Sequence, residues 1–260
     1  MKTIHSVAIV LILVLLGCVP ASAQKQPSAV EQRVAKALEA ANVPPSIKDN
    51  LIHQVKTNPD PFIGAITALT AQDPYLWRLV DKNHALDSSY VPEDLVTLKG
   101  GPYLVNRAGL QLRKEAALAL ERMAQAAQVD GVTLVVSSCY RSYEYQKQVY
   151  ERNVKSMGQA AADRESARPG HSQHQLGFAV DFGSIDDSFA KTAQSRWLQK
   201  NAWRYGWSLS YPENLESVTG YRWESWHYRY VGLQVSQFIR TYFEDIQQYA
   251  LVFLHYYTAE

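Results

Sequence analysis

Two histidines and a carboxylate that could bind a metal lie close together, at His171, His174 and Asp181. Asp181 falls in a run of alternating apolar residues that is typical of a strand. A lone carboxylate on such a strand is costly to bury unless it is paired or bound to a metal. Its face of the strand also carries the small residues Ala179 and Gly183, which leave room there for an ion.

A second cluster of polar residues lies far downstream, where Glu224 and His227 stand on either side of Trp226. Neutral imidazole and carboxylate oxygen are ordinary zinc ligands. Three protein ligands with an open fourth position make a catalytic site, whereas structural sites are usually closed by four ligands. The residue types in the two clusters therefore favour a catalytic metal site.

Hydrophobic periodicity predicts the elements that must position these residues. They are a helix over residues 110–129, strands over 132–137, 178–183, 205–212 and 220–230, and a last helix over about 235–257. Together they predict an α+β fold, in which a small central antiparallel sheet carries the metal site and helices flank it. Arg141 falls between a predicted strand and the helix that begins near Glu144, a junction where functional side chains are often presented.

The first 23 residues are predicted to be a signal peptide. Its apolar run over residues 7–16 is short for a bilayer span, and Ala21-Ser22-Ala23 fits the small-residue cleavage rule. A second reading stays open, because residues 15–18 resemble a bacterial lipobox that would end before a lipidated Cys18. Both readings predict an exported protein of the periplasm or cell envelope, anchored to the membrane in the second case.

The rest of the chain is predicted to divide into a helical extension over residues 24–70 and a main domain over 71–260 that ends in the C-terminal helix. In the extension, apolar residues recur at helical spacing from Val30 to Ala41, and Pro44-Pro45 then break the pattern. The formal net charge of +1 gives no reason to expect a nucleic-acid partner. We expect a monomer.

Several separate blocks carry a resemblance to a known family. They include Tyr140-Arg141-Ser142 with Gln146, the pattern Pro-Gly-x-Ser-x-His-Gln-x-Gly-x-Ala-x-Asp over 169–181, and Glu-x-Trp-His-Tyr-Arg-Tyr-Val-Gly over 224–232. Over roughly residues 79–233 the chain resembles the VanY-type D-alanyl-D-alanine carboxypeptidases. These are zinc peptidases related to lysostaphin-type and hedgehog-like domains. The resemblance implies that residues 71–260 hold a catalytic domain that removes the terminal D-alanine from peptidoglycan stem peptides.

The resemblance also implies a role for each matching residue. His174, Asp181 and His227 would bind Zn²⁺, and Glu224 would be the general base. Residues that would shape the substrate site are Arg141, Gln146, Ser172, Tyr211 and Trp226. Zinc lowers the pKa of its water and polarises the scissile carbonyl, and a nearby carboxylate moves the proton. Arg141 offers a fixed cationic fork for an oxyanion or a terminal carboxylate.

Two expectations follow from this assignment of roles. Glu224 and His227 are three residues apart and would lie on opposite faces of a regular strand, so we expect a bend or bulge between them. The family's ligand is the second histidine of the first cluster, so we expect His171 to lie beside the site without binding the metal.

Two positions depart from the family pattern. Cys139 stands where a small residue is usual, and it has no intramolecular partner after either processing route, so no disulfide supports the fold. Ser210 stands where the family often has arginine, before the pair Tyr211-Pro212, which leaves open which end of the substrate is gripped.

The sequence alone leaves two alternative functions open. The same motifs serve an L,D-carboxypeptidase that acts on tetrapeptide stems. A zinc-containing cell-wall binding module without catalysis is the alternative from another class, and the presence of both Glu224 and Arg141 weighs against it.

Overall fold

The computed structural model describes residues 26–259. The predicted signal segment and Cys18 lie outside the described residues, so both readings of the N-terminus stay predictions. Within residues 26–259, every helix is too short or too polar to cross a membrane.

The centre of the molecule is a five-stranded sheet in the order β2-β4-β5-β7-β6. Its strands are β2 Tyr103–Val105, β4 Leu134–Ser138, β5 Ala179–Phe182, β7 His227–Tyr230 and β6 Trp207–Leu209. A separate two-stranded antiparallel sheet joins β1 Leu95–Thr97 to β3 Gln111–Arg113. Helices flank the central sheet, so the predicted α+β class is confirmed.

The central sheet is antiparallel everywhere except at one edge, where β2 pairs with β4 in parallel. The prediction of an antiparallel sheet is therefore wrong for β2. Parallel neighbours need a long crossover between them, and α4, Lys114–Val129, supplies it. The expected strand over 132–137 corresponds to β4, while the expected strands over 205–212 and 220–230 shorten to β6 and β7.

The register of the sheet places two candidate ligands opposite each other. Asp181 on β5 pairs with His227 on β7. Side chains at directly paired positions lie close together on the same face. On the other side of β5, Asp181 pairs with Ser138 of β4, next to a register shift between Val136 and Ser138. The sheet thus gathers chemistry-bearing residues at one end of three neighbouring strands.

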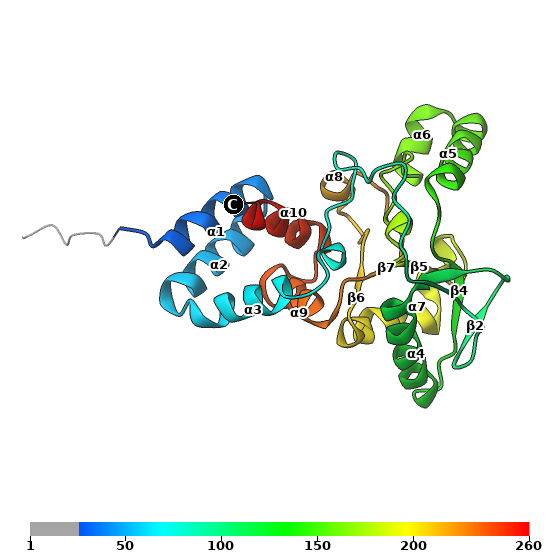
Figure 1. Ribbon diagram of the computed structural model, residues 1–260, viewed down its shortest axis with the longest axis horizontal. Coiled ribbons are helices and arrows are strands. Elements are labelled where there is room, and N and C mark those ends of the chain that lie inside the picture. Colours follow the sequence, from blue (N-terminus) through cyan, green and yellow to red (C-terminus); the bar gives the residue numbers. More distant parts are fainter. Residues whose placement is uncertain (1–25, 260) are drawn as a thin grey trace, which may run out of the picture.

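Helices far apart in the sequence gather at the other end of the molecule (Figure 1). They are α1 Ala29–Ala40, α2 Pro45–Thr57, α3 Asp60–Thr70, α9 Leu233–Tyr242 and α10 Gln247–Thr258. Their apolar faces form a hydrophobic core distinct from the core beneath the sheet. The extension therefore packs against the C-terminal helices, as Figure 1 shows with α1 beside α10.

The remaining helices lie around the sheet, with short 3₁₀ turns between elements. These helices are α5 Tyr143–Met157, α6 Gln159–Glu165, α7 Ala193–Asn201 and α8 Glu216–Thr219. The turns are η1 Pro74–Leu76, η2 Gln173–Leu176, η3 Asp187–Lys191 and η4 Ala202–Tyr205.

The single last helix predicted over 235–257 is wrong, because the chain breaks into α9 and α10. Glu244 and Asp245 lie between them with φ of 53° and 62°, in the left-handed region that cannot continue a right-handed helix. Arg240 of α9 closes the turn with an ion pair to Asp245 at 2.8 Å. The break turns the chain back, so that α10 packs along α1.

The ring of Phe62 joins the extension to the C-terminal helices. It is 1% exposed and lies within 5.7–6.2 Å of four aromatic rings, on Phe238, Tyr242, Phe253 and Tyr257. We expect Phe62→Ala to lower the free energy of unfolding by about 3–5 kcal/mol, the usual cost of removing a buried phenyl ring. Urea denaturation measures it. Ile63→Ala is the matched control, because Ile63 is 40% exposed on the same helix.

Candidate metal centre and active site

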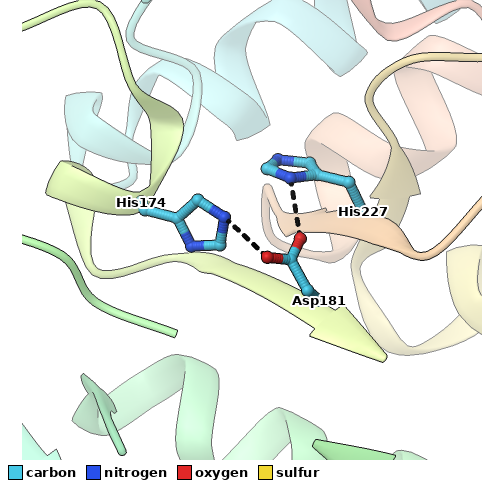
Figure 2. A group of neighbouring side chains, drawn as sticks. All are labelled: His174, Asp181 and His227. Atoms are coloured by element: carbon cyan, nitrogen blue, oxygen red, sulfur yellow. Dashed lines mark ion pairs between the residues drawn. The ribbon is translucent and has the colours of Figure 1, made fainter. Parts of the chain in front are cut away.

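Three buried side chains converge on one point, as Figure 2 shows for His174, Asp181 and His227. One ligand atom from each lies within 4.8 Å of the others. His174 Nε2 is 3.2 Å from Asp181 Oδ2, and His227 Nδ1 is 3.0 Å from Asp181 Oδ1. The structure thus brings together the three residues predicted as metal ligands.

Each candidate ligand comes from a different element. Asp181 and His227 stand on paired strands, while His174 belongs to the 3₁₀ turn η2 just before β5. Gly177 ends that turn with φ of +73°, and a Cβ there would meet the Arg113 side chain at 2.9 Å. Glycine is therefore needed for the sharp return that leads from His174 into the strand of Asp181.

The outer nitrogens of both histidines are hydrogen-bonded. His174 Nδ1 donates to the Cys139 carbonyl at 2.7 Å, because a carbonyl oxygen only accepts. His227 Nε2 lies 3.3 Å from the amide oxygen of Gln173, which also only accepts. With the proton on its outer nitrogen, each neutral imidazole would turn an unprotonated nitrogen toward Asp181. Such outer bonds orient metal-ligating histidines in general.

The arrangement of lone pairs fits a cation. Burial lowers the pKa of His174 to about 4, so this imidazole is neutral at neutral pH. Nitrogens of two imidazoles face the oxygens of one buried carboxylate, and among the described residues Asp181 Oδ1 has no hydrogen-bond partner. When these nitrogens are unprotonated, their lone pairs and those of the carboxylate oxygens lie about 3 Å apart and repel each other unless a positive charge lies among them. The residues present therefore fit a metal ion.

Arg141 lies beside this centre on the loop that follows β4. Its Nη2 is 4.0 Å from Asp181 Oδ2 and donates to Ser138 Oγ at 3.1 Å. Its Nη1 donates to Gln146 Oε1 at 2.8 Å, and Gln146 in turn donates to the Ala167 carbonyl at 2.6 Å. The guanidinium is thus held in a fixed orientation toward the metal-site carboxylate.

Glu224 precedes β7 in a turn, so the bend expected between Glu224 and His227 is confirmed. The main-chain amide of His227 donates to the Glu224 carbonyl at 3.2 Å, which closes the turn. Glu224 Oε2 then lies 3.7 Å from His227 Nδ1. Burial, followed by the charge of Asp181, raises the pKa of Glu224 well above its usual range. A bound dication would oppose that shift.

These groups open into a cleft of about 260 Å³. It is lined by Ser172, Tyr211 and Trp226, whose predicted role is substrate binding, and by Arg141 and Glu224. Gln146 does not line the cleft and instead lies behind Arg141. The pattern of the sequence did not single out several further lining residues, which are Val149, Asn153, Met157, Glu165, Tyr221 and Arg222. Those on α5 follow its helical spacing, but nothing local distinguishes them from an ordinary packed face.

His171 lies outside the cluster, as expected. Its Nδ1 is hydrogen-bonded to the main-chain carbonyl of Asp81 at 2.8 Å. Cys139 is a buried free cysteine, and burial raises the pKa of its thiol, which makes it inert at neutral pH. Ser210 is also buried, and its hydroxyl donates to Gln173 Oε1 at 2.7 Å.

Known proteins resemble this chain in sequence and in fold. A family model described as VanY, D-alanyl-D-alanine carboxypeptidase, matches residues 109–233. The chain is 37% identical over 194 residues to the putative carboxypeptidase YodJ of Bacillus subtilis, a match that covers 69% of this chain and 71% of that protein. The chain belongs to the VanY family of carboxypeptidases, and is therefore a peptidase by family.

Two solved structures are similar over most of their length. The LdcB LD-carboxypeptidase superposes with a TM-score of 0.60 and 36% identity, over 67% of this chain and 89% of that chain. A mutant of the vancomycin resistance D,D-pentapeptidase VanY, in complex with Zn(II), superposes with a TM-score of 0.53 and 33% identity, over 64% of this chain and 93% of that chain.

Proposed function

We propose that this protein is a zinc carboxypeptidase that removes the terminal D-alanine from peptidoglycan stem peptides. One observation carries the proposal. The three candidate metal ligands, the carboxylate of Glu224 and the guanidinium of Arg141 all face one cleft. The zinc complex of the similar VanY structure supports the choice of metal. Histidine nitrogen and carboxylate oxygen are also donors that zinc accepts.

His174, Asp181 and His227 would hold the zinc ion. When bound there, zinc lowers the pKa of a water molecule and polarises the scissile carbonyl. With protons on the outer nitrogens, which face the Cys139 carbonyl and Gln173 Oε1, His174 Nε2 and His227 Nδ1 would be free to act as ligands.

The proton transfers belong to Glu224. Its carboxylate takes a proton from the attacking water and returns it to the leaving amine of D-alanine, which is general base and then general acid catalysis. Arg141 presents a charged fork that can grip the terminal carboxylate of the stem peptide or the oxyanion that forms during attack. Tyr211 and Trp226 line the cleft, where they exclude water and orient the peptide.

An L,D-carboxypeptidase activity is the second candidate. The similarity to the LdcB LD-carboxypeptidase supports it. Within the cleft, Glu165 also offers a carboxylate that could pair with the side-chain ammonium of a diamino acid, the residue that precedes D-alanine in a tetrapeptide stem. This protein would then remove the single remaining D-alanine.

Export of the protein, with or without lipidation at Cys18, remains part of the proposal, because peptidoglycan lies outside the cytoplasm. A monomer suffices for the mechanism, since every proposed site residue comes from one chain.

Incubation with pentapeptide and tetrapeptide stems, followed by mass spectrometry of the products, tests the function. We expect the loss of one D-alanine from the pentapeptide, inhibition by EDTA, and recovery on adding zinc. Cleavage of the tetrapeptide alone would select the second candidate. No cleavage of either stem by the zinc-loaded protein would contradict the proposal and favour a binding module.

Penicillin is the matched inhibitor control, because it acylates the serine of Ser-x-x-Lys enzymes. That spacing occurs twice in the chain, at Ser22–Lys25 and at Ser188–Lys191. The serine of the first pair lies in the predicted signal segment. Ser188 is exposed beside Ser184 and does not line the cleft. Penicillin should therefore leave the activity unchanged.

A further inference from the structure

A chain of buried amides connects the C-terminal helix to the metal site. Gln247 is the first residue of α10, is 1% exposed, and lies beyond the residues that match the family model. Its Nε2 donates to the main-chain carbonyl of Ser208 on β6 at 3.2 Å. Its Oε1 accepts from Gln173 Nε2 at 3.3 Å. Gln173 then presents its own Oε1 to His227 Nε2 at 3.3 Å.

The donor and acceptor roles in this series of hydrogen bonds follow from the end at Ser208, where the acceptor is known. The Ser208 carbonyl only accepts, so it decides which end of the Gln247 amide faces it. Gln247 Oε1 must then face Gln173, whose Nε2 donates to it. This leaves Gln173 Oε1 facing His227, where the Ser210 hydroxyl also donates to it at 2.7 Å. Because an amide oxygen only accepts, Gln173 Oε1 provides an acceptor for a proton on His227 Nε2. Asp181 Oδ1 is the competing acceptor at Nδ1, 3.0 Å away, and the Nε2 proton is the one that leaves Nδ1 open to a metal.

We propose that Gln247 is a positioning residue that selects the metal-binding tautomer of His227. With the proton on Nε2, the lone pair of Nδ1 points toward Asp181, at 3.0 Å. The other tautomer would place a proton on Nδ1 and block that nitrogen as a ligand. The effect on zinc rests on the proposed function, whereas the tautomer itself does not. The helix that packs against the N-terminal extension thus also controls a metal ligand.

Gln247→Leu tests this assignment, because at similar side-chain volume it removes the hydrogen bonds of the Gln247 amide to Ser208, Gln173 and Ser210. Gln173 then loses the acceptor of its Nε2, and its amide is free to turn that nitrogen toward His227. We expect the imidazole to shift toward the tautomer with the proton on Nδ1. The ¹⁵N chemical shifts of the His227 ring in zinc-free protein report this directly. Zinc affinity, measured by competition with a chromophoric chelator, should fall about 10-fold, the lower end of the range for outer partners of metal ligands.

Gln248→Leu is the matched control. Gln248 is the next residue of the same helix and donates to Asp81 Oδ2 at 2.7 Å, away from the amide chain. This variant loses a comparable hydrogen bond but should keep both the His227 tautomer and the zinc affinity.

A wild-type His227 protonated on Nδ1 in the zinc-free protein would overturn the proposal, and this measurement needs no variant to fold. A Gln247→Leu protein with unchanged ring shifts and zinc affinity would overturn it as well. Because the ring shifts are read without zinc or substrate, they stand even if the protein cleaves no stem peptide. Failure of the tautomer assignment and failure of the proposed function are therefore distinguishable.

Discussion

His174→Ala is expected to lose zinc and peptidase activity together. His174 Nε2 is one of three ligand atoms that lie within 4.8 Å of one another, and the two that remain leave too few donors for a stable site. Loss of an outer partner alone typically costs 10–100-fold in metal affinity, so we expect the loss of a ligand to exceed about 100-fold. Elemental analysis of the purified protein and the stem-peptide assay measure the two effects.

His171→Ala is the control for this variant. His171 lies three residues earlier in the same loop, but its ring contacts the Asp81 carbonyl instead of the metal cluster. This variant should keep zinc at the wild-type content. Stoichiometric zinc in His174→Ala, or loss of zinc from His171→Ala alone, would show that the first histidine is the ligand.

Glu224→Gln is expected to keep zinc and the fold but to lose about 10²- to 10⁴-fold in turnover, the usual contribution of a general acid or base. The amide has the size of the carboxylate but cannot accept the proton of the attacking water. Glu224 is not among the three clustered ligands, which is why metal content and activity should separate. Zinc content, thermal unfolding and kcat with a stem peptide measure the separation.

Glu216→Gln serves as the matched control for the charge. Glu216 begins α8 and forms an exposed ion pair with Arg164, and it is not among the residues that line the cleft. Its replacement should leave kcat unchanged. A rate near wild type in Glu224→Gln would assign the proton transfer to another group.

The sequence by itself determined which residue types meet at the site. His174 and Asp181 lie in one short block and Glu224 with His227 in another, so local spacing was enough to single them out. It also indicated the α+β class, the strand that carries Asp181 and the bend before His227. These features are local, because a few neighbouring residues specify a strand, a turn or a motif.

Only the tertiary structure decided which neighbouring side chains hold these residues in place. Gln146 was predicted to touch the substrate, but the fold places it behind Arg141. The last helix breaks at Glu244 and Asp245, and that break brings Gln247 to within hydrogen-bonding distance of Gln173.

No local pattern could have predicted the contact between Gln247 and Gln173. The two residues are separated by 74 positions and meet only because the first residue of α10 is brought to β6, where it contacts Ser208. A buried glutamine in an apolar helix has the same sequence signature whether it caps a turn or holds a histidine. Its partners are chosen by packing between distant segments, and in our proposal those partners decide which nitrogen of His227 carries the proton.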